Sequence, residues 1–143
     1  MLKESFFFVR SLEQPDSNTL PDPGQRTYRI LAELVPNHPI YNGHFPGNPI
    51  VPGVCQIRMI TEIVADIIQK EVILQTADNI KFLSAINPHE TPRLTFDISL
   101  KPGEHDLLHC NAILSSGDKI FCKCKSVFQT RIRHHANTED FQV

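Results

Sequence analysis

Residues 38–54 read His-Pro-Ile-Tyr-Asn-Gly-His-Phe-Pro-Gly-Asn-Pro-Ile-Val-Pro-Gly-Val, and this stretch decides the fold. Together with Pro36 just before it, it holds five prolines and three glycines. Proline lacks the N–H that helices and central strands use, so we expect an ordered, turn-rich loop. A helical pattern begins directly after it, at Val54. The free N–H groups and the positive end of that helix therefore face the loop.

The expected helix covers residues 54–70 and is apolar over a wide arc, which is typical of a central helix. Its polar residues Arg58, Glu62 and Asp66 are spaced four apart and share one face. The apolar positions recur at helical spacing: Val54, Ile57, Ile60, Val64, Ile67 and Ile68, widened by Met59 and Ile63.

Elsewhere the hydrophobic pattern has a period of two, which predicts strands. The runs are 6–12, 28–35, 94–100, 108–114 and 120–128, with two shorter ones at 72–74 and 80–86. The sequence thus predicts an α+β fold in which a curled antiparallel sheet of about six strands wraps around one long central helix. One helix leaves sheet surface to cover, and pairing with a second copy is a natural solution.

The bulk numbers exclude several classes of protein. A chain of 143 residues predicts one domain, residues 1–143, with a flexible tail after about residue 131. A net charge of −2 gives no support for a nucleic-acid or membrane-surface binder, and no apolar run is long enough to span a bilayer. The four cysteines lack disulfide-framework spacing, which favours a reducing, cytoplasmic setting.

His44 is the candidate catalytic residue of the loop. It lies between Gly43 and Phe45 on a stiff, partly apolar segment, where an imidazole can transfer protons near neutral pH. The alternative is a loop histidine that only makes structural hydrogen bonds. His38, near the start of the loop, is expected to be a turn or cap residue.

The run Gly43-His44-Phe45-Pro46-Gly47-Asn48-Pro49-Ile50-Val51-Pro52-Gly53-Val54, followed by a buried helix, resembles the signature of 3-hydroxyacyl-(acyl-carrier-protein) dehydratases of the FabZ/FabA type. The resemblance implies a hot-dog fold and a homodimer or higher homo-oligomer with active sites at the subunit interface. It implies conversion of a 3-hydroxyacyl thioester, held on acyl carrier protein, to the trans-2-enoyl thioester. No metal and no organic cofactor are implied.

Carried over by position, the resemblance makes His44 the base. It gives the amide of Gly53 or Val54 the task of polarising the thioester carbonyl. We expect an apolar slot for the acyl chain along the helix. The slot and the loop together provide the expected substrate-binding residues, Phe45, Gly53, Val54, Ile57 and Phe82.

One position departs from the family pattern. Fourteen residues after the histidine the family carries a carboxylate, and this chain carries Arg58. Because guanidinium stays protonated, Arg58 is no proton donor. Glu62, one helical turn on, could replace the acid, or His44 could make both proton transfers while Arg58 supports an oxygen. Arg58 and Glu62 could also be a plain ion pair.

Two readings from other classes stay open. The first is a degenerate hot-dog subunit that binds acyl carrier protein or pairs with an active dehydratase. The second is an acyl thioesterase on the same fold, for which Glu62 is the sole candidate to orient water.

Cysteines and basic residues complete the pattern. Cys110, Cys122 and Cys124 share the inward faces of the last two strands, which favours small core residues over a zinc site. Cys55 follows the Pro-Gly turn, where a helix start would stabilise a thiolate. Five basic residues share the outward face of the last strand, where they could meet acyl carrier protein or simply be solvated: Lys119, Lys123, Lys125, Arg131 and Arg133.

Overall fold

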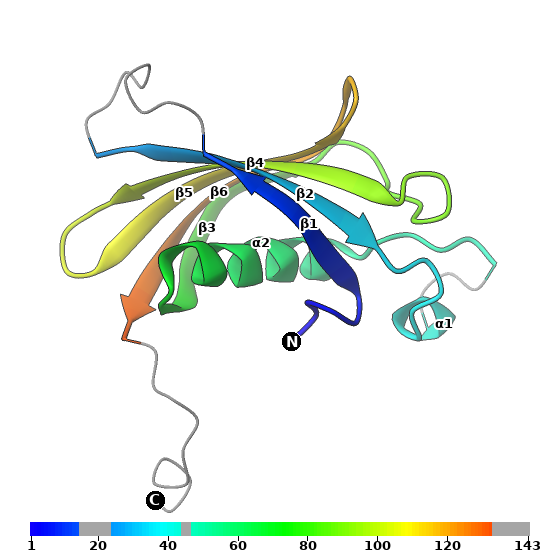
Figure 1. Cartoon of the computed structure of the whole chain (residues 1–143), viewed down its shortest axis with the longest axis horizontal. Helices are drawn as coiled ribbons and strands as arrows, with labels where there is room; N and C mark the ends of the chain where they lie inside the picture. The colour runs from blue at the N-terminus through cyan, green and yellow to red at the C-terminus, as the bar shows by residue number, and fades with distance from the viewer. Residues whose placement is uncertain (15–23, 44–46, 133–143) are drawn as a thin grey trace, which may run out of the picture.

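One twisted antiparallel sheet lies over one helix in the structure, a computed structural model that describes residues 1–14, 24–43 and 47–132 (Figure 1). The six strands have the order β1-β2-β4-β5-β6-β3. They comprise β1 (Phe7–Glu13), β2 (Arg26–Leu34), β3 (Glu71–Phe82), β4 (Arg93–Pro102), β5 (Leu107–Ser116) and β6 (Lys119–Arg131). The expected sheet of about six strands with a helix against it is confirmed.

The alternating pattern of the sequence becomes an inside and an outside of the sheet. In β4, Leu94, Phe96, Ile98 and Leu100 are all buried, while the residues between them are half-buried or exposed. Strands β4 and β5 pair in register, with Phe96 opposite Leu114. Since successive side chains point to opposite faces, one face of the sheet collects the core.

Helix α2 (Gly53–Ile68) packs its apolar face against that core. It has 16 residues, so it is shorter than the long central helix that the sequence predicts. It ends because Gln69 adopts a left-handed conformation, with φ 55° and ψ 41°. Strand β3 starts at Glu71, which leaves no room for another turn.

The predicted loop contains one turn of helix, α1 (Ile40–Gly43), so the expectation that no helix forms there is wrong for these four residues. The turn is possible because the segment 40–43 is free of proline, and the carbonyls of His38 and Pro39 accept the N–H groups of Tyr41 and Asn42, both at 3.0 Å. Nδ1 of His38 also accepts the N–H of Ile40 at 3.1 Å, which confirms the expected capping role.

Strand β3 is a single strand of 12 residues, where the sequence predicts two separate runs. Its pairing with β6 shifts register between Leu74 and Thr76 and again between Thr76 and Asn79, and these irregularities break the alternation. Strand β3 is also an edge of the sheet. Most of its residues are exposed or half-buried, so one long edge of the sheet faces solvent.

Two further features bear on the class of protein. Within the described ranges, no helix is long and apolar enough to cross a membrane. All four cysteines are free and buried, which confirms that Cys110, Cys122 and Cys124 are core residues. The expectation of a flexible tail concerns residues 133–143, which lie outside the described residues.

Candidate functional site

The start of α2 is the best-defined part of the predicted site. Pro52 is the N-cap, with φ −61° and ψ 146°, and its carbonyl accepts the N–H groups of Cys55 at 3.0 Å and Gln56 at 3.1 Å. The N–H groups of Gly53 and Val54 precede these bonds and have no acceptor within the described part of the chain. Two backbone donors and the positive end of a helix therefore remain free for a carbonyl or an anion.

Gly53 lies in close contact with the ring of Phe82, which lies at the end of β3. A Cβ on Gly53 would be 2.8 Å from Cζ of Phe82, closer than such contacts occur. The ring stays 52% exposed, and the neighbouring Val54 is 76% exposed. The structure thus brings together three of the predicted substrate-binding residues, from positions almost thirty residues apart.

The segment that leads into α2 is held by two hydrogen bonds, one to the connection between β3 and β4 and one to α2 itself. The N–H of Val51 donates to the carbonyl of Ile86 at 2.9 Å. The side-chain amide of Gln56, which is 3% exposed, donates to the carbonyl of Val51 at 3.3 Å. These bonds fix the segment before α2 relative to the helix and to the connection between β3 and β4.

The remaining predicted residues are described only in part. His44 and Phe45 lie outside the described residues, so the positions of the proposed base and its neighbour stay predictions. Ile57 is half-buried, and Ile60 on the same helix is almost fully buried at 1% exposure. Both pack in or against the core.

Glu62 is held by three donors, two of which come from the other end of the chain. The backbone N–H groups of Leu2 and Lys3 donate to its two oxygens at 2.7 and 2.8 Å, and Nε of Arg58 donates at 3.0 Å. Glu62 is 6% exposed, while the Arg58 side chain is 56% exposed. The predicted ion pair therefore exists, and its carboxylate also fixes the N-terminal segment.

Asp66, one turn further along α2, bonds to the Lys3 ammonium. Both acidic residues of α2 thus engage the segment at residues 2–3. Arg58, Thr61 and Glu62 also line a surface pocket of about 240 Å³, together with residues at the start of β3. The Arg58 position therefore borders open space beside the exposed sheet edge.

Burial sets the chemistry of the cysteines. It raises the pKa of Cys55, so the prediction of a stabilised thiolate at the helix start is wrong. Cys55 is 8% exposed, and burial disfavours the charged form of its thiol. Burial likewise raises the pKa of Cys110 to about 12 and that of Cys122 to about 11. No cluster of three or more metal-binding side chains occurs among residues 1–14, 24–43 and 47–132.

The N-terminal contacts to Glu62 are the feature that sequence reasoning missed. Leu2 and Lys3 lie 60 and 59 residues from Glu62, and their donors are backbone groups that carry no side-chain signal. The one sequence signal for these contacts is the acidic residue Glu62 within an otherwise largely apolar helix.

Solved structures with this arrangement place the chain among the hot-dog fold proteins. The dehydratase heterocomplex ApeI:P from Xenorhabdus doucetiae matches with a TM-score of 0.59 and 21% identity, over 85% of this chain and 96% of that one. A hypothetical thioesterase from Streptococcus pneumoniae, solved with coenzyme A, matches with a TM-score of 0.54 and 11% identity, over 87% and 89% of the two chains. At such identities the likeness shows the fold alone.

Comparison of the sequence with protein-family models identifies the family. The family model of ApeI-like dehydratases matches residues 21–118, and the chain belongs to that family. The 3-hydroxyacyl-(acyl-carrier-protein) dehydratase FabZ of Caulobacter sp. (strain K31) is 26% identical over 93 residues, which are 59% of this chain and 56% of that protein. The chain spans about half the length of the curated relatives it matches.

Proposed function

We propose that the chain is a hydro-lyase that converts a 3-hydroxyacyl thioester on acyl carrier protein to the trans-2-enoyl thioester. The observation that carries the proposal is the start of α2, where the N–H groups of Gly53 and Val54 have no acceptor among the described residues and lie beside the half-exposed Phe82 ring. Membership of the dehydratase family supports the same reaction.

The reaction needs two functions at one place. The proton at C2 of the thioester is weakly acidic, so negative charge that develops on the carbonyl oxygen must be stabilised. Two backbone donors at a helix start supply such stabilisation, which is worth about 3 kcal/mol per donor in comparable sites. His44, eight residues before the N-cap, is the proposed base that removes the proton.

The engagement of Glu62 supports His44 as the source of the second proton. A carboxylate that accepts bonds from Leu2, Lys3 and Arg58 has most of its acceptor sites occupied, so turning it toward a substrate hydroxyl would cost some of those bonds. We therefore assign both transfers to His44. The imidazole takes the C2 proton, the C3–O bond breaks, and the imidazolium returns the proton to the departing hydroxyl, which leaves as water. Arg58 supports the departing oxygen.

Interconversion of 3-hydroxyacyl and trans-2-enoyl thioesters on acyl carrier protein by the purified chain tests this proposal. We expect His44→Ala to lower turnover by about a hundredfold or more, since general base catalysis contributes that much. The matched control is His109→Ala, an exposed histidine on β5, which should keep full activity. Full activity of His44→Ala would refute the mechanism, and release of free acid would instead identify a thioesterase.

A second candidate function is a partner subunit without its own activity. The observation that favours it is Arg58 at the acid position, paired with a carboxylate that is itself occupied. In that case the chain alone converts neither thioester but still binds acyl carrier protein. The variant Arg58→Glu then shows whether the missing carboxylate is the cause of inactivity. A gain of activity marks position 58 as a decayed acid position, and no gain with carrier binding intact supports the partner subunit.

A dimer built along the β3 edge would complete the fold. Leu74 and Phe82 lie opposite the buried residues Phe128 and Cys122 of β6, so they belong to the core face, yet they are 38% and 52% exposed. An edge strand of 12 residues with unpaired backbone groups is a ready surface for another strand. We expect a homodimer by light scattering, and Leu74→Lys should shift it toward monomer.

The outer face of β6 is the proposed contact for acyl carrier protein. Lys123 and Lys125 are exposed on it, and Lys81 of β3 lies directly opposite Lys123. Like charges placed opposite each other are unfavourable unless an acidic partner covers them. Arg131 is already paired with Glu71 at 3.2 Å, and Lys119 lies over the Phe121 ring. Arg133 lies outside the described residues.

A further inference from the structure

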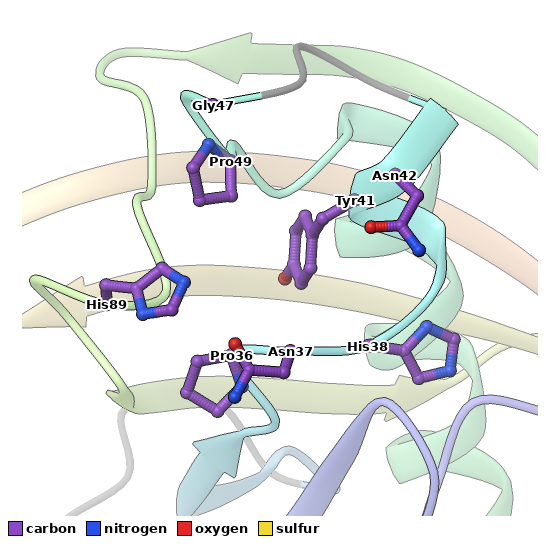
Figure 2. Close-up of a pocket in the computed structure, with 8 residues that line it drawn as sticks. All are labelled: Pro36, Asn37, His38, Tyr41, Asn42, Gly47, Pro49 and His89. Carbon is purple, nitrogen blue, oxygen red and sulfur yellow. The ribbon is translucent and has the colours of Figure 1, made fainter.

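A pocket of about 490 Å³ lies between the segment that follows β2 and the loop that precedes β4. Figure 2 shows the side chains that line it. Its volume is within the usual range of small-molecule sites. The lining residues are Pro36, Asn37, His38, Tyr41, Asn42, Gly47, Pro49 and His89.

Two side chains extend into this pocket from opposite walls. The Tyr41 ring directs its buried hydroxyl toward the side of the pocket where Asn37 and His89 lie, and the His89 ring projects from the facing loop (Figure 2). The Asn37 amide lies on the floor between them in this view. The His38 ring is turned away toward Phe6, with ring centroids 5.3 Å apart, so it belongs to the wall.

The Tyr41 hydroxyl is the informative group. Tyr41 is 6% exposed and packs against Phe6 with ring centroids 5.6 Å apart. Its hydroxyl is buried and has no hydrogen-bond partner in the part of the chain that the structure describes. A buried hydroxyl without a partner is unfavourable, and natural proteins keep few of them. Burial raises the pKa of Tyr41, so the group is a neutral phenol at any ordinary pH.

We propose that this pocket binds the uncharged, amide-bearing part of a ligand through the Tyr41 hydroxyl, the Asn37 side-chain amide and the His89 imidazole. The hydroxyl and the side-chain amide can each donate and accept, which matches the N–H and C=O of a ligand amide. The flat prolines Pro36 and Pro49 cover the apolar parts of such a ligand.

The lining decides against a charged ligand. No Lys, Arg, Asp or Glu is among the eight lining residues. Transfer of a carboxylate or phosphate from water into a site without a fixed opposite charge is strongly unfavourable, whereas a neutral amide needs only its hydrogen bonds restored. This inference does not depend on the proposed dehydratase reaction.

Protein NMR titration tests the inference on the full chain. The probes are two neutral diamides, pantetheine and a blocked glycine dipeptide, and two anions, acetate and inorganic phosphate. We expect saturable shifts of the amide signals of residues 37–42 and 89 with a diamide. Saturation by pantetheine only points to a carrier arm as the source, and saturation by the dipeptide only points to a peptide backbone.

The chain offers a matched pair of variants, because Tyr28 and Tyr41 are its only two tyrosines. Tyr41→Phe should weaken diamide binding about fivefold, the effect of one hydrogen bond. Tyr28→Phe, on β2 and outside the pocket, should leave it unchanged. Tyr41→Phe should also melt at a higher temperature than the wild type without ligand, since an unpaired buried hydroxyl is removed.

Three binding results would overturn the inference. The first is binding of the anions alone, and the second is no saturable shift with either diamide. The third is equal affinity in the wild type and Tyr41→Phe. A lower melting temperature of Tyr41→Phe would likewise contradict it, because the hydroxyl would then have a stabilising partner within the protein.

Discussion

Glu62→Gln should destabilise the fold by about 2 kcal/mol, because the carboxylate anchors the N-terminal segment. Its two oxygens accept the N–H groups of Leu2 at 2.7 Å and Lys3 at 2.8 Å, and the side chain is 6% exposed. Hydrogen bonds to a charged group contribute about 1.5–3 kcal/mol each. The amide of glutamine keeps one acceptor but turns an NH₂ group toward the other donor.

Two considerations set the upper limit of this effect. The Arg58 guanidinium is 56% exposed, so its pairing with Glu62 adds only a few tenths of a kcal/mol. The segment at Leu2–Lys3 can also open to water, which recovers part of the loss. We therefore expect a fall of about 6 °C in melting temperature for a chain of this size.

Urea unfolding followed by circular dichroism measures the change, at one fixed protomer concentration because the chain is expected to associate. The matched control is Glu71→Gln, which breaks an exposed ion pair with Arg131 and should change stability by less than about 0.5 kcal/mol. Hydrogen exchange should show protected amides at Leu2 and Lys3 in the wild type only. Equal stability of both variants, with fast exchange at Leu2 in the wild type, would refute the reasoning.

Two further predictions concern the helix start and the buried thiols. Gly53→Ala should lower turnover severalfold, and its free energy of unfolding should stay within about 1 kcal/mol of the wild type, because the new Cβ meets only the half-exposed end of the Phe82 ring. Steady-state kinetics and a melting curve measure the two effects. If the ring itself lines the substrate slot, the double variant Gly53→Ala, Phe82→Ala should not recover activity. The folded pKa values of about 12 for Cys110 and about 11 for Cys122 are raised above the unfolded value, so their contribution is complete below about pH 9. It is lost progressively as the pH rises from about 9 toward the folded pKa values, because the unfolded chain forms the thiolates first. Urea midpoints at pH 8 to 11 measure the slope, and an equally steep slope in the Cys110→Ala, Cys122→Ala double variant would contradict its assignment to these thiols.

Most of the fold could be predicted from local pattern, because period-two alternation directly encodes which face of a strand is buried. The alternation over 94–100 and the helical spacing after Val54 both correspond to observed elements. The errors fall where local pattern is weak. The register shifts in β3 break the alternation. Helix α1 depends on the carbonyls of His38 and Pro39, which accept N–H groups from a segment without proline.

The candidate site could be predicted only in part. Proline and glycine fix backbone conformation locally, so the helix start at Gly53 and its free donors follow from the sequence. The sequence could pair Arg58 with Glu62 by their spacing, but it could not show what else Glu62 binds.

By itself, the sequence determined the properties that depend on neighbours along the chain: the strand faces, the helix start and the capping by His38. Only the tertiary structure decided the properties that depend on distant segments. It brought the backbone of Leu2 and Lys3 to Glu62, laid Phe82 on Gly53, and left the Tyr41 hydroxyl without a described partner. The reason is physical: a hydrogen-bond donor or a van der Waals contact has no signature in the sequence until folding has set the distance between the two groups.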